Sequence, residues 1–378
     1  SMERSKSMKV IIERSTFLKA LGHVQSVVER RNTIPILSNV LLQAEGNALA
    51  LTATDLDIEI AEQVSADVEQ AGAITASALT LYEIVRRLPE GAQVRLDTEG
   101  SDGRLKLTAG KSDFNLAVLP DQDFPSLTVD NEGVEFSMPS KELKRLIDKT
   151  RFAMSQEETR YYLNGVYFHA VTEGDRALRA VATDGHRLAR LDSPLPDGAD
   201  NIPGVIIPRK AVLELRRLLD DAGEQVQVSV SEAKVRFTFD SVTLTSKLID
   251  GTFPDYQRVI PSGNDRTLKV ETADFAKAVD RVSTVSADKT RSVKMILEGD
   301  HLQLIVNNPE TGSAQEELNV DYGAEALEIG FNAKYLLEVA SQIDGDTATF
   351  EFADPSSPTL ISDEEDVQAL YVLMPLRV

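Results

Sequence analysis

The feature that most constrains the fold is an amphipathic helix pattern that recurs at intervals of about one third of the chain. In one series the apolar faces pass through Phe17, Leu143 and Phe275, which lie 126 and 132 residues apart. In a second series the intervals are 131 and 124 residues, between Leu88, Leu219 and Ile343. Solenoid repeats are only about 20–50 residues long, so a unit of this length is a complete domain. The spacing therefore predicts three tandem domains of one architecture.

Strand patterns recur between the helices. Apolar and polar residues alternate, as in half-buried strands, over 39–62, 163–191 and 293–306. Further short strands follow each helix of the second series, over 94–118, 226–247 and 347–375. Each domain is thus predicted to be α+β, with two helices packed on antiparallel sheets. The predicted domains are 8–128, 129–256 and 257–378, after a tag or disordered tail at 1–7. The alternative is three unrelated α+β domains whose spacing agrees by coincidence.

Charge is distributed unevenly between the helices and the rest of the chain. The formal net charge is −21 at pH 7, which counts against a protein that binds phosphates over its whole surface. The predicted helices nevertheless hold 19 Lys and Arg against 9 Asp and Glu, so they carry +10 and the remainder carries −31. The helices are predicted at 15–31, 77–88, 140–151, 208–219, 273–291 and 332–343. This pattern indicates a basic helical surface within an acidic protein.

An alternative explanation of the basic residues is that cations favour the last turn of any helix. That preference accounts for six arginines, Arg30, Arg31, Arg86, Arg87, Arg216 and Arg217. It does not account for a basic group in an early turn, Lys141, Lys144 and Arg145.

Composition limits the chemistry and the location of the protein. The chain has no Cys, which excludes disulfides, thiolate catalysis and cysteine zinc sites and fits a reducing compartment. It has no apolar run of the roughly 18 residues that span a membrane, and no signal segment opens it. We therefore expect a cytoplasmic protein.

The catalytic and metal-binding patterns that we tested predict neither an enzyme nor a cofactor or metal site. The four His lack metal-ligand spacing to one another, and Asp184 and His186 fit turn chemistry better than an acid–base pair. The alternating acids Asp55, Asp57 and Glu59 fit a solvated strand face better than a cation site. A run that resembles the end of a phosphate loop, Gly110-Lys111-Ser112, has Leu105 where the motif requires glycine.

Five segments resemble one known family. They are Thr33–Asn39, Arg160–Gly165, Ala182–Leu188, Ser246–Tyr256 and Tyr371–Val378. They are similar to segments of the bacterial sliding clamps, the beta subunits of DNA polymerase III, and the match runs in order from Met8 to Val378.

The resemblance implies a ring-shaped, head-to-tail homodimer of clamp domains, with helices lining the hole and strands outside. Twelve helices at about 10 Å spacing would leave a hole of about 28 Å, wide enough for duplex DNA. Such a ring holds DNA by topology and needs no base readout. The implied function is that of a processivity factor that tethers DNA polymerase III to its template and has no catalytic centre.

The resemblance also implies three sets of functional residues. The DNA-facing set is Arg31, Arg86, Tyr161, Tyr162, Lys210 and Arg217. The set that lines a cleft for partner peptides is Leu163, Thr183, Gly185, His186, Arg187, Leu188, Pro254, Arg258, Val259, Val372, Met374, Pro375 and Leu376. The set at the subunit interface is Arg104, Lys106, Lys111, Phe114, Leu116, Thr284, Val285, Glu310, Glu316 and Glu317. The implied partners are the polymerase III alpha subunit, the delta subunit of the clamp loader, other DNA polymerases and mismatch-repair proteins.

Two other functions fit parts of the pattern. A three-domain scaffold protein could dock peptides without ever encircling DNA. An enzyme could use Asp184 and His186 as acid and base. Ordinary helix-surface charge and tyrosine packing would likewise explain the DNA-facing set without any DNA.

Overall fold

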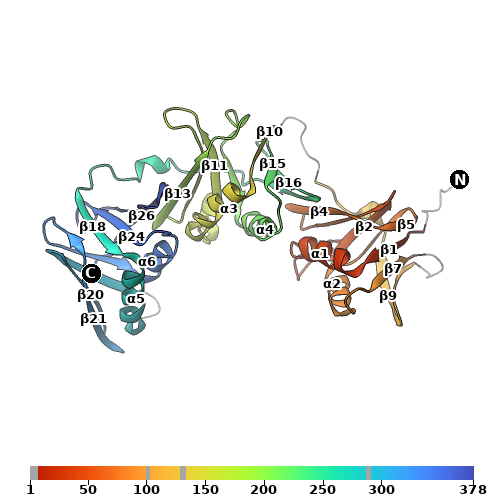
Figure 1. The fold of residues 1–378 in the computed structure, drawn as a ribbon, viewed down its shortest axis with the longest axis horizontal. Coiled ribbons are helices and arrows are strands. Elements are labelled where there is room, and N and C mark those ends of the chain that lie inside the picture. The colour runs from red at the N-terminus through yellow and green to blue at the C-terminus, as the bar shows by residue number, and fades with distance from the viewer. Residues whose placement is uncertain (1–6, 99–102, 128–132, 287–290) are drawn as a thin grey trace. The chain divides into compact units, whose positions relative to one another are not determined.

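The computed structural model describes residues 7–98, 103–127, 133–286 and 291–378 (Figure 1). The chain forms two compact units. The N-terminal unit comprises 1–141, 201–203 and 210–248, and the C-terminal unit comprises 142–200, 204–209 and 249–378. The predicted boundary at 128/129 and residues 1–6 of the predicted tail lie outside the described residues, and the three domain ranges remain predictions.

The described residues form six α-helices, in the places where the sequence pattern predicts them. They are α1 (Arg14–Gln25), α2 (Ala78–Arg87), α3 (Ser140–Asp148), α4 (Arg209–Leu219), α5 (Thr272–Val282) and α6 (Ala333–Ala340). They carry 14 Lys and Arg against 7 Asp and Glu, so the predicted excess of positive charge is smaller but keeps its sign. None of these helices, in the part of the chain that the structure describes, is long and apolar enough to cross a membrane.

Two predicted helices extend far beyond the observed ones, and the predictions 140–151 and 332–343 each end three residues too late. Helix α1 ends at Gln25 instead of residue 31, because its last carbonyl groups bond to an arginine distant in sequence, described below. Helix α5 ends at Val282 and continues as a short 3-10 turn, Ser283–Val285. Arg31 therefore lies beyond the end of α1 and not on it.

Antiparallel pairing joins the strands of the N-terminal unit into one sheet of thirteen, in the order β10-β15-β16-β17-β4-β3-β2-β6-β9-β8-β7-β1-β5. The sheet passes from the first third of the chain to the second where β4 pairs with β17. The strands are β1 (Lys9–Glu13), β2 (Asn39–Glu45), β3 (Ala48–Thr54), β4 (Ile58–Ser65), β5 (Asp67–Gln70), β6 (Gly72–Ser77), β7 (Gln93–Asp97), β8 (Arg104–Ala109), β9 (Ser112–Leu119), β10 (Val134–Pro139), β15 (Gln225–Val230), β16 (Lys234–Phe239) and β17 (Val242–Lys247).

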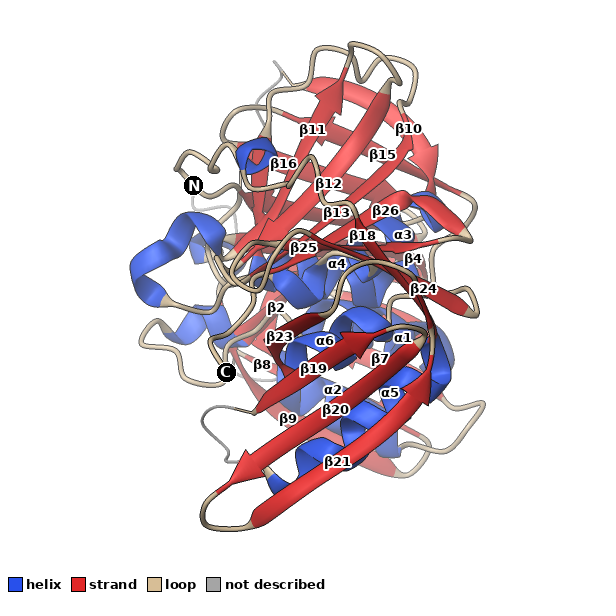
Figure 2. Cartoon of the chain, turned by 90° about the vertical axis from the view of Figure 1, so that its left-hand side faces the viewer, coloured by secondary structure: helices blue, strands red, loops and turns tan. Residues whose placement is uncertain are grey.

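The C-terminal unit contains a nine-stranded sheet, β14-β11-β12-β13-β26-β25-β24-β18-β22, and a four-stranded sheet, β21-β20-β19-β23. Here the sheet passes from the second third to the last where β13 pairs with β26. Figure 2 shows β21 at the outer edge of its sheet. The strands are β11 (Gly165–Val171), β12 (Ala177–Thr183), β13 (Arg187–Pro194), β14 (Val205–Pro208), β18 (Arg266–Glu271), β19 (Ser292–Glu298), β20 (His301–Asn308), β21 (Gly312–Asn319), β22 (Asp321–Tyr322), β23 (Leu327–Asn332), β24 (Thr347–Phe352), β25 (Thr359–Asp363) and β26 (Asp366–Leu373).

The turns before β4 and β13 are built alike. The carboxylate of Asp55 accepts a hydrogen bond from the backbone N–H of Asp57 (2.9 Å), and that of Asp184 accepts one from His186 (2.9 Å). This confirms the turn interpretation of Asp184. The expected strand face is wrong for Asp55 and Asp57, which belong to the turn, whereas Glu59 lies in β4.

The predicted apolar faces form the cores. Phe17 and Leu21 of α1 and Phe275 and Val279 of α5 are fully or almost fully buried. Burying one such side chain stabilises a fold by about 1.5–3 kcal/mol. The helices thus cover their sheets with one face and leave the other face to charged residues.

A buried charged cluster lies within the N-terminal unit, between α1 and elements of two thirds of the chain. His23 of α1 bonds through Nδ1 to Glu62 of β4 and through Nε2 to Asp221, just after α4 (2.8 Å). The hydrogen bond to Glu62 raises the pKa of His23, and Asp221 adds to this effect, while burial opposes it. His23 therefore serves as a cation between two carboxylates.

We predict that His23→Gln lowers the stability of the protein in a pH-dependent way. Because the pKa of His23 is raised in the folded state, its contribution is fully present below about pH 6.5 and is lost as the pH rises through the folded-state pKa. Urea unfolding should show a difference of about 1–3 kcal/mol from the wild type at pH 6 that shrinks toward pH 9. A difference that is constant over this range, or that grows with pH, would contradict the assignment.

Candidate functional site

The DNA-facing residues that the resemblance implies differ in their exposure. Arg31 is exposed and, within the described part of the chain, makes no hydrogen bond or ion pair. Tyr161, in the 3-10 segment Glu158–Leu163, is 53% exposed and stands edge-on to the half-buried Tyr162, with ring centroids 5.7 Å apart. Arg86 is half exposed and forms an ion pair with Glu83 at 2.8 Å. These side chains are accessible to a ligand.

Arg217 of α4 bonds within the chain, and its expected contact with DNA stays a prediction. Its guanidinium donates to the carbonyl oxygens of Gly22 (3.2 Å) and His23 (2.6 Å), in the last turn of α1, and also bonds to Ser26. The last carbonyls of a helix have no partner within the helix, so a cation there is favourable. Arg217 thus ends α1 and joins it to α4.

Lys210 completes the same junction within the N-terminal unit. Its ammonium group donates to the carbonyl oxygen of Val27 (2.8 Å), to Asp55 (2.7 Å) and to Glu29. Burial acts to lower the pKa of Lys210, but the hydrogen bonds to Asp55 and Glu29 outweigh it and raise the pKa. Because two carboxylates already neutralise this charge, Lys210 should bind a phosphate more weakly than Arg31 does.

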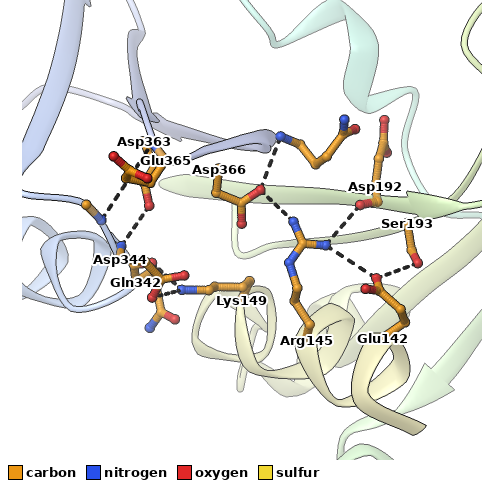
Figure 3. Close-up of polar contacts among 12 residues, drawn as sticks. Glu142, Arg145, Lys149, Asp192, Ser193, Gln342, Asp344, Asp363, Glu365 and Asp366 are labelled. Carbon is orange, nitrogen blue, oxygen red and sulfur yellow. Dashed lines mark hydrogen bonds and ion pairs between the residues drawn. The ribbon is translucent and has the colours of Figure 1, made fainter. Parts of the chain in front are cut away.

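A corresponding junction lies within the C-terminal unit (Figure 3). Lys149, just after α3, donates to the carbonyl oxygen of Gln342 and to Asp344 (2.9 Å), beyond the end of α6. Arg145 of α3 donates to Asp366 (2.5 Å) and to the carbonyl oxygen of Asp192 (3.2 Å). Basic residues of α3 therefore hold the second and last thirds of the chain together.

The structure gathers three of the expected cleft residues, Leu163, Leu188 and Val372, into one apolar cluster. The other buried members are Val181, Ile206, Phe253 and Tyr256. The set that the resemblance implies does not include these four. The alternation along β12 could have identified Val181. It pairs with Arg190 across the hairpin and therefore lies on the same face as Leu188.

The last residues of the chain border this apolar cluster. Beyond β26 the backbone N–H of Met374 donates to the carbonyl oxygen of His186 (2.9 Å), and that of Leu376 donates to Gly330 (2.8 Å). A Cβ at Gly330 would lie 3.0 Å from the carbonyl oxygen of Leu376, so this close approach requires glycine. The exposed members of the expected set are His186, Gly185, Pro254, Arg258, Val259 and Leu376, while Thr183, Met374 and Pro375 are partly buried.

Arg187 is not among the residues of the apolar cluster, and its place in the cleft stays a prediction. Successive side chains of a strand point to opposite faces, so Arg187 lies opposite Leu188. Its buried guanidinium bonds to Asp184 (3.1 Å) and Glu338, and it stacks on the ring of Tyr335 at 4.2 Å. Arg187 fixes the turn that carries His186 and ties β13 to α6.

The expected subunit-interface residues lie at two strand edges. Strand β9 carries Phe114 and Leu116, both half-buried, and pairs with β8 along its length but with β6 only at Val118 and Leu119. Strand β21 pairs with β20 alone among the described strands. Arg104 and Lys106 lie on β8 and Lys111 in the β8–β9 turn; Thr284 and Val285 form the 3-10 turn after α5; and Glu310, Glu316 and Glu317 lie in or beside β21.

Several of these charges already have partners in the single chain. Glu316 accepts from Arg281 at 2.8 Å, which lowers the pKa of that carboxyl. Glu317 lies 3.3 Å from His301, and Lys106 lies 3.7 Å from Asp113. All these pairs are exposed, so each contributes little to stability and can exchange partners. Among the described residues no group of three or more His, Asp and Glu could hold a metal ion.

Comparison with known proteins matches the whole length of the chain. Family models of the DNA polymerase III beta subunit match residues 8–128 (N-terminal domain), 137–255 (central domain) and 257–377 (C-terminal domain). The chain is 59% identical to the beta sliding clamp of Caulobacter vibrioides (strain NA1000 / CB15N) and 39% identical to that of Escherichia coli (strain K12), covering 98% of this chain and all of each relative. A crystal structure of a DnaN sliding clamp from Bartonella birtlesii bound to griselimycin has a TM-score of 0.96 at 51% identity, over 98% of this chain and all of that one.

We predict that Arg217→Met lowers the free energy of unfolding, whereas Arg31→Met does not. Arg217 supplies several hydrogen bonds to the end of α1 and is partly exposed, so its loss should cost about 1–2 kcal/mol. Exposed Arg31 should change stability by less than about 0.5 kcal/mol. Urea unfolding of both variants beside the wild type measures the difference. Equal stability of the two variants would show that Arg217 does not cap α1.

Proposed function

This chain belongs to the family of DNA polymerase III beta subunits, the bacterial sliding clamps, and on that premise we propose which of its residues carry out each part of the function. Members of this family are ring-shaped dimers that encircle DNA, hold the polymerase on its template and have no catalytic activity. The protein is accordingly a processivity factor. Its place is the cytoplasm, where the bacterial replication machinery works.

The observation that carries the proposal is that, among the described strands, β21 pairs on one side only and β9 pairs with β6 at just two residues. Strand β17 pairs with β4 in the N-terminal unit, and β26 pairs with β13 in the C-terminal unit. In the first third of the chain β9 corresponds to β17, and in the last third β21 corresponds to β4. Exposed edges of this kind are templates for pairing. A second copy, placed head to tail, pairs β9 with β21 twice and closes a ring.

The pairing of β4 with β17 within the chain also predicts the register in which β9 pairs with β21 of the second copy. Ile60 of β4 is opposite Leu244 of β17. Asn308 and Asp55 hold equivalent positions, because the side chain of each accepts a hydrogen bond from the backbone N–H two residues later. Counting along the two hairpins from these residues makes Ala314 the counterpart of Ile60. The two-residue turns of the β8–β9 and β16–β17 hairpins likewise make Phe114 the counterpart of Leu244.

Ala314 therefore lies opposite Phe114 of the second copy. The same register sets Lys111 opposite Glu317 of the second copy, which brings opposite charges together. Thr284 and Val285, beside the β20–β21 hairpin, cover the apolar side chains of the joint, and Arg104, Lys106, Glu310 and Glu316 lie around it.

The DNA surface comprises Arg31, Arg86, Tyr161, Tyr162, Lys210 and Arg217. Exposure supports Arg31 and Tyr161 as direct contacts with the phosphate backbone. Lys210 and Arg217 act mainly by holding the helices together, because their charges already have partners. Few tight contacts suit a ring, since topology retains the DNA and weak nonspecific contacts allow it to slide.

The partner surface is the apolar cluster together with the C-terminal tail. A short peptide with apolar side chains can pack on Leu188 and Val372, with Val259 and Leu376 exposed beside them. The polymerase III alpha subunit, the clamp loader delta subunit, other DNA polymerases and mismatch-repair proteins bind there in turn. Apolar anchors that fill a preformed site dominate the binding energy of such interfaces.

We predict that Asn115→Cys combined with Ser313→Cys gives a disulfide between two copies. Opposed residues of antiparallel strands have Cα atoms about 4.5–5.5 Å apart, which fits a disulfide. The absence of native Cys makes the reaction specific. A non-reducing gel should show a species of twice 41.4 kDa.

The control is Asn115→Cys with Gln315→Cys, which is on the same face but two residues out of register. It should crosslink far less, and each single variant should not form the same species. Crosslinking of the control pair instead would overturn the register. No crosslinking, with a solution mass of one subunit, would overturn ring closure by a second copy.

We predict that Val259→Asp combined with Leu376→Asp weakens binding of the polymerase III alpha subunit at least tenfold, about 1.4 kcal/mol. Both side chains are exposed, so the dimer and its melting temperature should be unchanged. Leu79→Asp, on the exposed face of α2, is the matched control and should bind normally. Surface plasmon resonance without DNA measures the affinities. Normal binding by the double variant would place the partner site elsewhere.

A further inference from the structure

A cavity lies beside the apolar cluster, within the C-terminal unit. It encloses about 940 Å³ and is lined by residues of α3, β12 and β13, among them Glu142, Arg145, Arg179, Arg190 and Asp192. Arg176, Val367 and Gln368 lie at its sides. None of the functions discussed above uses this cavity.

Three of its four arginines have carboxylate partners. Arg179 forms two hydrogen bonds with Asp192, at 2.6 and 2.9 Å. Arg176 lies 2.5 Å from Asp200. Arg145 is held by Asp366, as Figure 3 shows. Arg179 and Arg145 are held by these contacts within the fold, and Arg176 is an exposed arginine that is paired with Asp200.

Arg190 is different. It lies on β13 and is only partly exposed, and its Nε atom is buried without a hydrogen-bond partner in the described part of the chain. No carboxylate among the described residues lies within ion-pair distance of it. Burial, and then the nearby Arg179, lower the pKa of Arg190. A buried donor without a partner is unfavourable, and a guanidinium without a carboxylate partner can form a charge-assisted pair with an arriving anion.

The cavity and the apolar cluster share the face of one sheet. Arg190 lies two residues after Leu188 of the cluster, so their side chains point to the same face about 6.8 Å apart. Tyr256 belongs to the cluster, and its hydroxyl accepts a hydrogen bond from Arg179 (3.1 Å) and bonds to His169 (2.8 Å). The Nδ1 atom of His169 lies 3.3 Å from the carbonyl oxygen of Ala170, to which it can only donate, so Nε2 accepts a hydrogen bond from the Tyr256 hydroxyl, and burial lowers the pKa of His169. Tyr256 thus links the apolar cluster to Arg179, which lines the cavity.

We propose that this cavity is an additional pocket for the partner peptide, in which Arg190 binds one carboxylate side chain two or three residues from the apolar anchors. The inference rests on the proposed partner site and extends it. A single carboxylate fits better than a nucleic acid or a nucleotide, because one guanidinium lacks a partner while acidic side chains line the same cavity, Glu142, Glu173, Asp175 and Asp192. Several phosphates would be repelled there.

The test uses fluorescent peptides that carry the clamp-binding segment of the alpha subunit. In one series a single Glu is placed two or three residues beyond either end of the apolar anchors, and each peptide has a twin with Gln. Anisotropy titrations measure both twins on the wild-type dimer and on Arg190→Gln. The control variant is Arg176→Gln, which changes an exposed arginine of the same cavity that is already paired with Asp200.

At one position of the series the wild type should bind the Glu peptide about tenfold more tightly than its Gln twin. This preference should disappear in Arg190→Gln, persist in Arg176→Gln and weaken with added salt. The melting temperature of Arg190→Gln should not fall, because the arginine lacks an internal partner at Nε.

Three outcomes would overturn the inference. The first is equal affinity for Glu and Gln at every position. The second is a Glu preference that survives in Arg190→Gln. In both cases binding of the Gln peptides would leave the apolar partner site intact. The third is failure of every peptide to bind the wild type, which would overturn the proposed partner site as well.

Discussion

Strand edges need neighbours, and this constraint organises the whole molecule. Each third of the chain presents one edge that accepts a strand and one that supplies it. Within the chain, β4 pairs with β17 and β13 pairs with β26. The edges of β9 and β21 are left to pair with a second copy of the chain. The proposed pairing of β9 with β21 completes the dimer, and its proposed register follows from the β4–β17 joint. Ring closure, and with it the capture of DNA, is thus a consequence of sheet pairing.

The positive charge of the helices serves two purposes that the sequence pattern does not separate. Arg217 and Lys149 hold the ends of helices that belong to neighbouring thirds of the chain. Arg31 and Arg86 remain exposed. The chain outside the helices carries the net negative charge, which discourages DNA from binding there. A modest number of exposed cations then suffices, because the closed ring and not the affinity for phosphate keeps the protein on DNA.

Periodicity predicted the three repeats, the six helices and the alternating strands, because those features depend on local spacing. The resemblance supplied the site residues, and Leu163, Leu188 and Val372 do lie in one cluster. The sequence could not show that α1 ends at Gln25, since Arg217, which bonds there, is almost 200 residues away. The roles of Tyr256 and Arg190 were hidden for the same reason. The alternation of side chains along a strand, however, is enough to predict that Arg187 and Leu188 point to opposite faces of β13.

The central claim is that the protein holds DNA by encircling it, and one measurement tests this most directly. The protein is loaded by its clamp loader onto a nicked circular plasmid, the complex is isolated in high salt, and half of it is cut once with a restriction enzyme. The account predicts that protein stays on the uncut circle and leaves the linear DNA through its ends. Equal loss from both forms, or equal retention on both, would contradict it.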